Sequence, residues 1–353
     1  MLKVILLSCL FLASNASAES MEELKVRAAE GDSGAQSSLG VIYANGEGVD
    51  RDLKAAIKWW QLAAEQGNAV AQRNLGIAYT DGDGTDRDYS EAAKWYRLAA
   101  EQGDASAQRN LGYSYYNGEG IDQDYKEAIK WFRLAADQGD SDAQLMVGFM
   151  YGNGEGVRQN EKKSNIWYRL AAEQGNSAAQ YNLGLSLYYG EGDKKDKKEA
   201  AKWFRRAAEQ GDSDAQLWLG QMNLSGEGVD QNHKEALKWF LLSAEQGNSV
   251  AQASLASLYM FGEGVIQDYK EATKWLLLSA EQGVLPSQAA LGAAYFEGKG
   301  VPKDYKTAHM WLNIAAANGN EDAGAMRDAT EKLMSPEDVS EAQDMAREWV
   351  KNH

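Results

Sequence analysis

The side chains that could act as nucleophiles, bases or metal ligands are few in this sequence. The chain of 353 residues has three histidines, at positions 233, 309 and 353, and one cysteine, Cys9. Catalysis needs a nucleophile, a base and an orienting group brought together, or a metal ion with its ligands. No serine is followed three residues later by lysine, and no Gly-x-Ser-x-Gly occurs. We therefore expect no catalytic residues and no enzymatic activity.

One segment resembles a metal-binding loop. Residues 81–88 read DGDGTDRD, but the glycine at loop position six and the glutamate at position twelve are missing, and Ala92 stands at the latter. Paired glycines such as Gly46 and Gly48 recur along the chain without the third glycine of a phosphate loop. We therefore expect turns at these segments, with no metal and no cofactor.

These turns belong to a pattern that repeats every 36 residues. Glycine recurs at this interval from Gly31 to Gly319, and tryptophan recurs at the same interval from Trp59 to Trp311. Self-similarity at a fixed period of 20 to 50 residues is typical of a solenoid. A single helical pair cannot bury both of its faces, so neighbouring pairs must supply the missing surface.

The unit at 104–139 is the most legible copy, and it predicts two helices. Ala107, Leu111 and Tyr115 recur at four-residue spacing with Gly112 beside them, which gives one helix a packing face. Asp104 is its expected N-cap. The glycines of Asn117-Gly118-Glu119-Gly120 then allow a sharp reversal.

The second helix of the unit is expected to start after Asp124. Glu127 lies three residues further on, which is the spacing of a capping box. Gly139 is the expected residue after its C-cap. The predicted buried stripe consists of Ala128, Trp131, Phe132, Ala135 and Ala136.

The common residues of the units, AQxxLGxxYxxGxGVxxDYxEAxKWxxxAAEQG, resemble the Sel-one-like repeat (SLR), a relative of the tetratricopeptide repeat. The resemblance implies an all-α fold, a right-handed α/α solenoid or superhelix whose first helices line a concave groove that binds other proteins. Because family members have been linked to penicillin binding, it also suggests a remote alternative, a cell-wall or β-lactam hydrolase. The missing serine motifs argue against that activity.

The chain is predicted to fall into four parts. Residues 1–18 have a positive Lys3, a short apolar core and Ala16-Ser17-Ala18, which is typical of a secretory signal peptide. The segment at 19–31 is an N-terminal capping half-repeat, and 320–353 form C-terminal capping helices. Eight repeats lie between them, at 32–67, 68–103, 104–139, 140–175, 176–211, 212–247, 248–283 and 284–319.

Composition narrows the class of partner. The formal net charge is −16, whereas a nucleic-acid surface needs clustered lysine and arginine, so we expect no nucleic-acid binding. No second apolar run is long enough to span a bilayer, so we expect no membrane insertion once the signal is removed. The four lysines at 194, 195, 197 and 198 form a local basic patch that does not change this expectation.

The predicted partner-binding residues are those of the first helices that point away from the packing stripe. Subtracting the common residues leaves Arg73, Asn74, Arg109, Asn110, Tyr113, Met146, Phe149, Tyr181, Asn182 and Trp218. Aromatic, methionine and arginine side chains are typical anchors for a protein or peptide. The resemblance adds that asparagines at such places hold the backbone of a bound peptide in related repeats. Two alternatives stay open: the apolar residues pack on a neighbouring repeat, or the arginines pair with nearby acids.

The sequence thus predicts an exported, non-enzymatic repeat scaffold that binds a protein or peptide ligand. It would act as a periplasmic adaptor or regulator, or alternatively as a secreted factor that engages a host protein. The partner, its location and the oligomeric state stay open.

Overall fold

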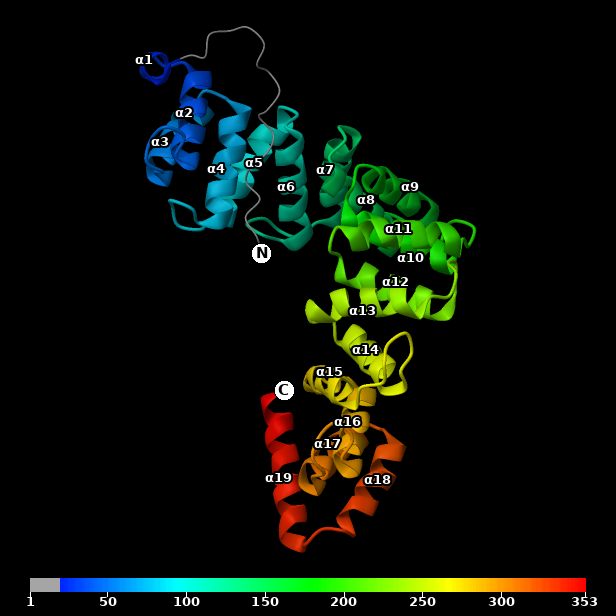
Figure 1. Cartoon of the computed structure of the whole chain (residues 1–353). Helices are drawn as coiled ribbons and strands as arrows, with labels where there is room; N and C mark the ends of the chain where they lie inside the picture. Colours follow the sequence, from blue (N-terminus) through cyan, green and yellow to red (C-terminus); the bar gives the residue numbers. More distant parts are fainter. Residues whose placement is uncertain (1–19) are drawn as a thin grey trace. The chain divides into compact units, whose positions relative to one another are not determined.

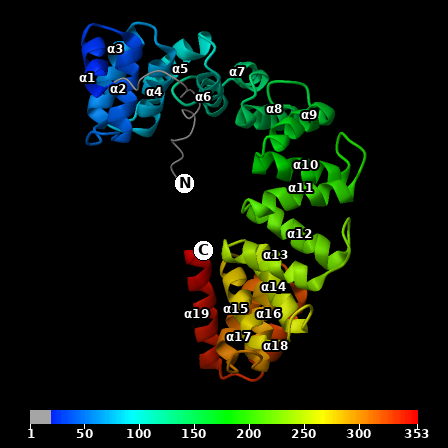
Figure 2. The same ribbon diagram turned by 45° about the horizontal axis from the view of Figure 1, so that its top comes forward.

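The computed structural model describes residues 20–353, and every regular element in that range is helical. The predicted signal peptide, residues 1–18, lies outside the described residues. The chain divides between Asn160 and Glu161 into two compact units, called unit 1 and unit 2 below. Figures 1 and 2 show successive helical pairs within each unit.

The helices of unit 1 are α1 (Met21–Ala29), α2 (Ser33–Asn45), α3 (Leu53–Glu65), α4 (Ala69–Asp81), α5 (Tyr89–Glu101), α6 (Ala105–Asn117), α7 (Tyr125–Asp137) and α8 (Ser141–Asn153). Those of unit 2 are α9 (Glu161–Glu173), α10 (Ser177–Tyr189), α11 (Lys197–Glu209), α12 (Ser213–Ser225), α13 (His233–Glu245), α14 (Ser249–Phe261), α15 (Tyr269–Glu281), α16 (Leu285–Glu297), α17 (Tyr305–Ala317), α18 (Glu321–Glu331) and α19 (Pro336–Asn352). From α2 to α17 the even-numbered helices are the first helices of the repeats and the odd-numbered ones are the second helices.

Within each unit a first helix packs against its own second helix and against the second helix of the preceding repeat. Each hairpin therefore closes the apolar face that its neighbour leaves open, as expected for stacked repeats. The predicted α-solenoid is confirmed.

The ends of the first helix form as predicted. Asp104 accepts a hydrogen bond from the backbone N–H of Ala107 at 2.8 Å, and Gly118 ends the helix with a φ of 74°. Gly120 also has a positive φ, 72°, and a Cβ there would lie 2.0 Å from the carbonyl oxygen of Tyr89. The second glycine of the pair thus lets the turn approach the preceding repeat's second helix.

The predicted capping box of the second helix is wrong. The side chain of Asp124 accepts from the backbone N–H of Lys126 and Glu127, but Glu127 pairs with Lys130 instead of returning a bond to the cap. The reason is that the backbone N–H of Asp124 already donates to the carbonyl of Tyr115 at 2.9 Å. That donor needs no second partner, so the glutamate turns outward.

The predicted buried stripe is confirmed except at one residue. Ala128, Phe132, Ala135 and Ala136 are buried, whereas Trp131 is half-buried. A Cβ on Gly112 would lie 2.7 Å from the ring of Phe132, so only glycine lets the two helices of the hairpin come this close. Since Phe132 takes the central place between the helices, Trp131 lies at the edge of the core.

Hydrogen-bonded pairs of glutamines, one buried and one exposed, form a ladder along the repeats that the sequence reasoning missed. The side-chain amide of Gln108 donates to the carbonyl of Ala100 at 3.1 Å, and its Oε1 accepts from Nε2 of Gln138 at 2.8 Å. The same rung joins Gln66 to Gln36, Gln102 to Gln72, Gln210 to Gln180, Gln246 to Gln216, and Gln282 to Gln252. Because a buried amide is costly when unpaired, the ladder helps to fix the spacing of repeats.

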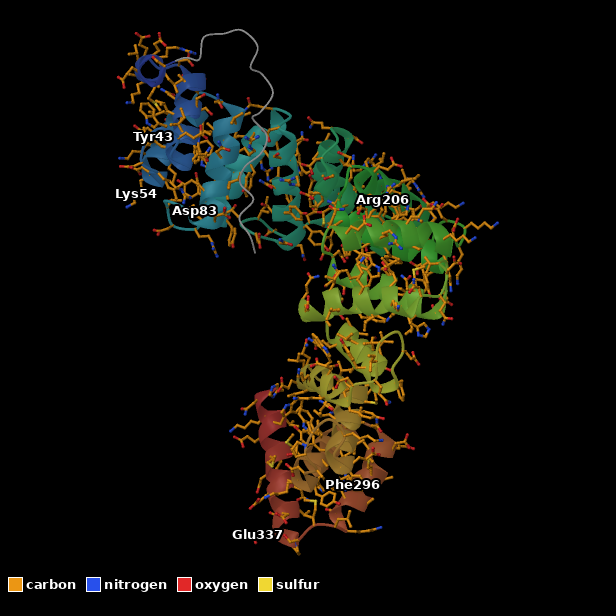
Figure 3. The ribbon with its side chains drawn as sticks, in the orientation of Figure 1. Tyr43, Lys54, Asp83, Arg206, Phe296 and Glu337 are labelled. Carbon is orange, nitrogen blue, oxygen red and sulfur yellow. The ribbon has the colours of Figure 1, made fainter. Side chains whose placement is uncertain are left out.

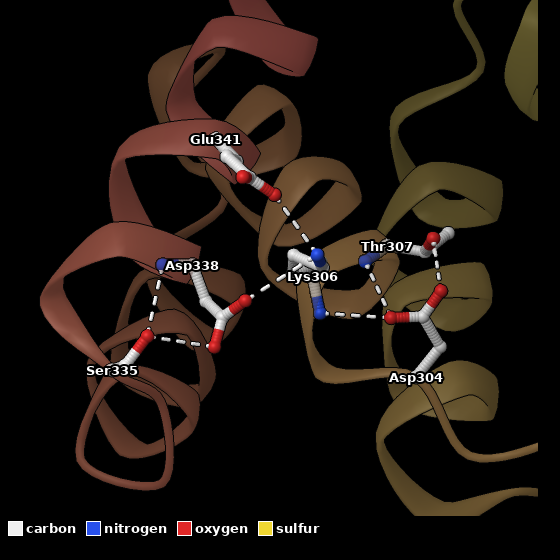
Figure 4. Close-up of polar contacts among 6 residues, drawn as sticks. All are labelled: Asp304, Lys306, Thr307, Ser335, Asp338 and Glu341. Atoms are coloured by element: carbon white, nitrogen blue, oxygen red, sulfur yellow. Dashed lines mark hydrogen bonds and ion pairs between the residues drawn. The ribbon is translucent and has the colours of Figure 1, made fainter.

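The last second helix is covered by the C-terminal helices. In both views α19 lies beside α17 (Figures 1 and 2). The hydroxyl of Ser335 caps α19 by accepting from the backbone N–H of Asp338 at 3.1 Å. Lys306 of α17 pairs with Asp338 at 3.3 Å and with Glu341 at 2.9 Å (Figure 4). The apolar face of α19 meets α17, where Trp311 and Trp349 have ring centroids 5.5 Å apart.

Candidate protein-binding surface

The ten predicted binding residues occupy three equivalent places on the first helices. The first place holds Arg73, Arg109 and Tyr181; the second holds Asn74, Asn110, Met146, Asn182 and Trp218; the third holds Tyr113 and Phe149. Helices α4, α6 and α8 carry those of unit 1, and α10 and α12 carry those of unit 2. All but Phe149, which is exposed, are half-buried.

In unit 1 the first place ties one repeat to the next. The guanidinium of Arg73 contacts Asp104 at 2.8 Å, and that of Arg109 contacts Asp140 at 2.9 Å and Asp142 at 3.2 Å. Asp104 and Asp140 are also the N-caps of α6 and α8. Each capping carboxylate therefore serves its own helix and the preceding repeat at once, and the salt-bridge alternative for these arginines is the one that the structure displays.

Tyr113 and Asn110 lie on the same face of unit 1 and contact aromatic side chains. The ring of Tyr113 meets Phe132 edge to face, with centroids 4.9 Å apart. Burial raises the pKa of Tyr96 to about 12, and hydrogen bonds with Thr80 and Asn110 oppose that rise. The side chain of Asn110 therefore contacts the hydroxyl of Tyr96, which belongs to the preceding repeat.

In unit 2 the same face carries a group of aromatic rings. Trp218 of α12 stacks on Phe204 with centroids 5.6 Å apart and an interplanar angle of 7°. Its edges meet Tyr188 at 4.9 Å and Tyr189 at 5.9 Å, both from α10. The ring centroids of Tyr181 and Phe204 lie 5.9 Å apart. Trp218 therefore packs against three rings of the preceding repeat while part of it stays exposed.

The carboxylates beside these rings differ from those of unit 1. Tyr181 stands where Arg109 would pair with the next capping aspartate, which is Asp212 here. Burial, followed by repulsion from Asp214, raises the pKa of Asp212, while its capping bonds oppose that rise. Burial and the same Asp214 also raise the pKa of Tyr181. The face of unit 2 therefore joins rigid aromatic rings to a carboxylate that lacks an arginine.

Tyr188, at one edge of this aromatic group, contacts two charged side chains. Glu227 accepts a hydrogen bond from the hydroxyl of Tyr188 and pairs with Lys197 at 2.6 Å. The ammonium of Lys197 also lies 4.6 Å from the centroid of the Tyr188 ring. One lysine of the predicted basic patch is thus paired within the protein.

Asn182 lies next to Tyr181 but is turned to its own helix. Its side-chain amide donates to the carbonyl of Ala178 at 2.8 Å. One of its two N–H donors is therefore engaged in this state, and the second N–H and the carbonyl oxygen are the groups left to face a ligand.

The residues that could have done chemistry are dispersed. His233 begins α13, His309 lies in α17 and His353 follows α19. Among residues 20–353 no three histidine, cysteine or acidic side chains are grouped so as to hold a metal ion. The calcium-like segment is the turn between α4 and α5, where Figure 3 labels Asp83, and Asp88 caps α5 through Glu91. None of the helices described is long and apolar enough to cross a bilayer.

Two residues of the aromatic group escaped the sequence reasoning. Tyr189 is 54% exposed at the end of α10, and Phe204 is the buried ring beneath Trp218. Tyr189 stands where the third repeat has Asn117, so a comparison of equivalent places over the whole first helix could have found it. The stacking of Trp218 on Phe204 joins two consecutive repeats, so no local sequence pattern predicts it.

Comparison with known proteins places these hairpins in a family. The Sel1 repeat matches eight times without a gap, at 33–68, 69–104, 105–140, 141–176, 177–212, 213–248, 249–284 and 285–320. No protein among those with curated functions matched the sequence.

Two solved structures are similar over nearly their whole length. A Sel1 repeat protein from Oxalobacter formigenes has 32% identity and a TM-score of 0.66, over 88% of this chain and 89% of that one. The protein c5321, a protective antigen of uropathogenic Escherichia coli with an SLR fold, has 31% identity and a TM-score of 0.52, over 94% of this chain and 86% of that one. The suspected resemblance is confirmed, and the chain belongs to the Sel1 repeat family.

Proposed function

We propose that the protein is an exported, non-enzymatic scaffold that binds another protein through the faces of its first helices, as a periplasmic adaptor or regulator. Proteins built from Sel1 repeats act as protein-interaction scaffolds. The observation that carries the proposal is the aromatic group of unit 2, where Trp218 is fixed by Phe204 and Tyr188 and stays half-buried. A rigid, partly exposed aromatic ring is the usual anchor of a protein interface.

The chemistry of this surface indicates what a partner should offer. Tyr181 and Trp218 supply apolar area, and Asp212 and Asp214 supply negative charge beside it. A segment with a lysine or arginine next to an apolar side chain is complementary to both features. Burying Asp212 further would be favourable only with such a cation, because a buried unpaired charge is costly.

A secreted factor that engages a host protein is the second candidate. It is supported by the similarity to c5321, which is a protective antigen in uropathogenic Escherichia coli. Export is common to both candidates and rests on the predicted signal peptide at 1–18. Fractionation of producing cells into cytoplasm, periplasm and medium separates them, and retention of an uncleaved chain in the cytoplasm would contradict both.

Binding is tested by capture from the compartment in which the protein is found. The tagged wild-type chain should retain a defined protein, and Trp218→Ala should lose it while keeping its helical circular dichroism. Lys238→Ala, at a well-exposed position on the second helix α13, is the matched control and should retain the partner. Equal retention by all three proteins would contradict the proposed surface. Turnover of a β-lactam or a muropeptide by the pure protein would contradict the non-enzymatic part.

A further inference from the structure

A cavity in unit 2 lies apart from all ten predicted binding residues. It has a volume of about 510 Å³ and lies between α9, the end of α10 and the turn that leads to α11. Asn165, Ile166, Arg169 and Leu170 of α9 line one side. Leu187 of α10 lies on the other.

The cavity lies where one repeat lacks an internal tyrosine. Leu187 is equivalent to Tyr115 of the third repeat, and Arg169 is equivalent to Arg97 of the second. There Tyr115 is buried, its hydroxyl accepts a hydrogen bond from the Arg97 guanidinium at 2.6 Å, and Cζ of Arg97 lies 5.7 Å from the ring centroid. At the cavity the arginine is kept and the phenol is missing.

One buried acceptor atom at the cavity has no hydrogen-bond donor. Asn165 is 1% exposed, and its Nδ2 donates to the carbonyl of Glu191 at 2.6 Å and to Asp193 at 3.1 Å. Its Oδ1 is buried and accepts no hydrogen bond. Because an unpaired buried acceptor costs free energy, a donor from a ligand would be favourable there. Asn165 and Arg169 are four residues apart, so they share one face of α9.

The outer face of α9 is apolar beside the cavity. Ile166 is 59% exposed and Leu170 is 41% exposed. The equivalent pair in α17, Met310 and Ile314, is only 8% and 1% exposed, in a cluster with Ala346 of α19. In α17, therefore, a helix of the same chain, α19, covers the apolar pair. Lysine stands at the place of Ile166 in six other repeats, as Lys58, Lys94, Lys130, Lys202, Lys238 and Lys274.

We propose that this cavity binds a tyrosine side chain of a partner polypeptide. The ring takes the place beside Arg169 that Tyr115 takes beside Arg97. The hydroxyl accepts from the guanidinium and donates to Oδ1 of Asn165, and an adjoining apolar residue covers Ile166 and Leu170. The cavity is lined by four carboxylates and two cations, so the neutral phenol is favoured over a phosphotyrosine.

The site is tested with 4-methylphenol, the tyrosine side chain alone, and with toluene, which lacks the hydroxyl. The probe is titrated into the full chain labelled at isoleucine methyl groups. We expect a saturable shift of the Ile166 methyl signal, with toluene binding about fivefold more weakly because it makes neither hydrogen bond. Leu187→Tyr, which restores the ring of other repeats, should abolish the shift. Arg169→Met should remove the preference for the phenol.

Three outcomes would overturn the proposal: no shift at Ile166, an unchanged shift in a folded Leu187→Tyr protein, or equal binding of both probes. A leucine-tyrosine peptide should bind more tightly than 4-methylphenol, and its phosphotyrosine form more weakly. If 4-methylphenol binds and neither peptide does, the occupant is a free phenol, and the assignment to a polypeptide is wrong. Since no lining residue belongs to the ten on the first helices, failure here leaves the function proposed for those residues intact.

Discussion

The two units use the same place of the first helix in different ways. In unit 1 it holds Arg73 and Arg109, each paired with the aspartate that caps the next first helix. In unit 2 it holds Tyr181, and burial raises the pKa of the corresponding Asp212. A position that varies among the repeats can therefore either join repeats or leave an aromatic ring and a carboxylate for a partner.

The second place shows a similar contrast between two repeats, although unit 1 also has Met146 there and unit 2 also has Asn182. It holds Asn110 in unit 1, near the hydroxyl of Tyr96, and Trp218 in unit 2, stacked on Phe204. We therefore expect unit 1 to contribute mainly stability at these places and unit 2 mainly binding. The predictions that follow test this division, beginning with the largest expected effect.

Trp218→Ala should weaken capture of the partner by at least about tenfold, because truncating a central aromatic anchor costs roughly 2 kcal/mol or more. Asn110→Ala changes the equivalent place of unit 1 and should weaken capture by less than about threefold. Quantitative binding to the captured partner measures both. Similar losses of binding in the two variants would contradict the proposed difference between the units.

Arg109→Met should lower the free energy of unfolding by about 2 kcal/mol, because it leaves the half-buried Asp140 without its cation. Lys126→Met, on the exposed side of α7, controls for the loss of a positive charge and should change stability by about 0.5 kcal/mol or less. Urea unfolding followed by circular dichroism measures both variants. If both variants lower the free energy of unfolding equally, the ion pair of Arg109 with Asp140 contributes no more than a surface charge, which would contradict the prediction.

Tyr181→Arg should give unit 2 the pairing of unit 1. The new guanidinium should reach Asp212, raise stability by about 1 kcal/mol and lower the pKa of that carboxyl. The same change should weaken partner capture, since it removes an aromatic ring and neutralises the acid. Urea unfolding and the capture assay provide the two readouts. A variant that is less stable yet binds as well as wild type would count against the comparison.

Asp212→Asn should stabilise the protein slightly, by about 0.5 kcal/mol at pH 7. Asparagine caps equally well, as Asn176 and Asn248 do, and it removes a charge that burial disfavours. Because the folded pKa of Asp212 is raised, the folded protein binds its proton first. The advantage of the variant should therefore shrink as pH falls through that folded pKa. Asp140→Asn, which breaks an ion pair, should be destabilising, and stabilisation by both would contradict the assignment.

Much of the fold could be predicted from the sequence because each repeat carries its own local signals. Asp104 at a cap, Gly118 and Gly120 in the turn, and Gly112 beneath Phe132 are local requirements of backbone geometry, and the structure meets them. The capping box at Glu127 was wrong because a tertiary bond from Tyr115 had already satisfied the donor. That bond joins the two helices, so the spacing of three residues alone could not reveal it.

The candidate surface was only partly predictable. Residue type singled out Trp218, but its stacking on Phe204 and its contact with Tyr189 depend on how consecutive repeats pack. Arg73 and Arg109 were open to two interpretations until the capping aspartates were placed beside them. The cavity near Leu187 was missed because a missing ring is visible only when its equivalent, Tyr115, is seen paired with Arg97.

The most direct test of the central claim is a photo-crosslinking experiment in the producing cells. A photoreactive phenylalanine derivative replaces either Tyr189 or Asn117, which occupy the same exposed place of unit 2 and unit 1. We predict a discrete crosslinked protein from position 189, which Trp218→Ala abolishes, and none from position 117. No crosslink from 189, or the same crosslink from both positions, would contradict the claim that the aromatic face of unit 2 binds the partner.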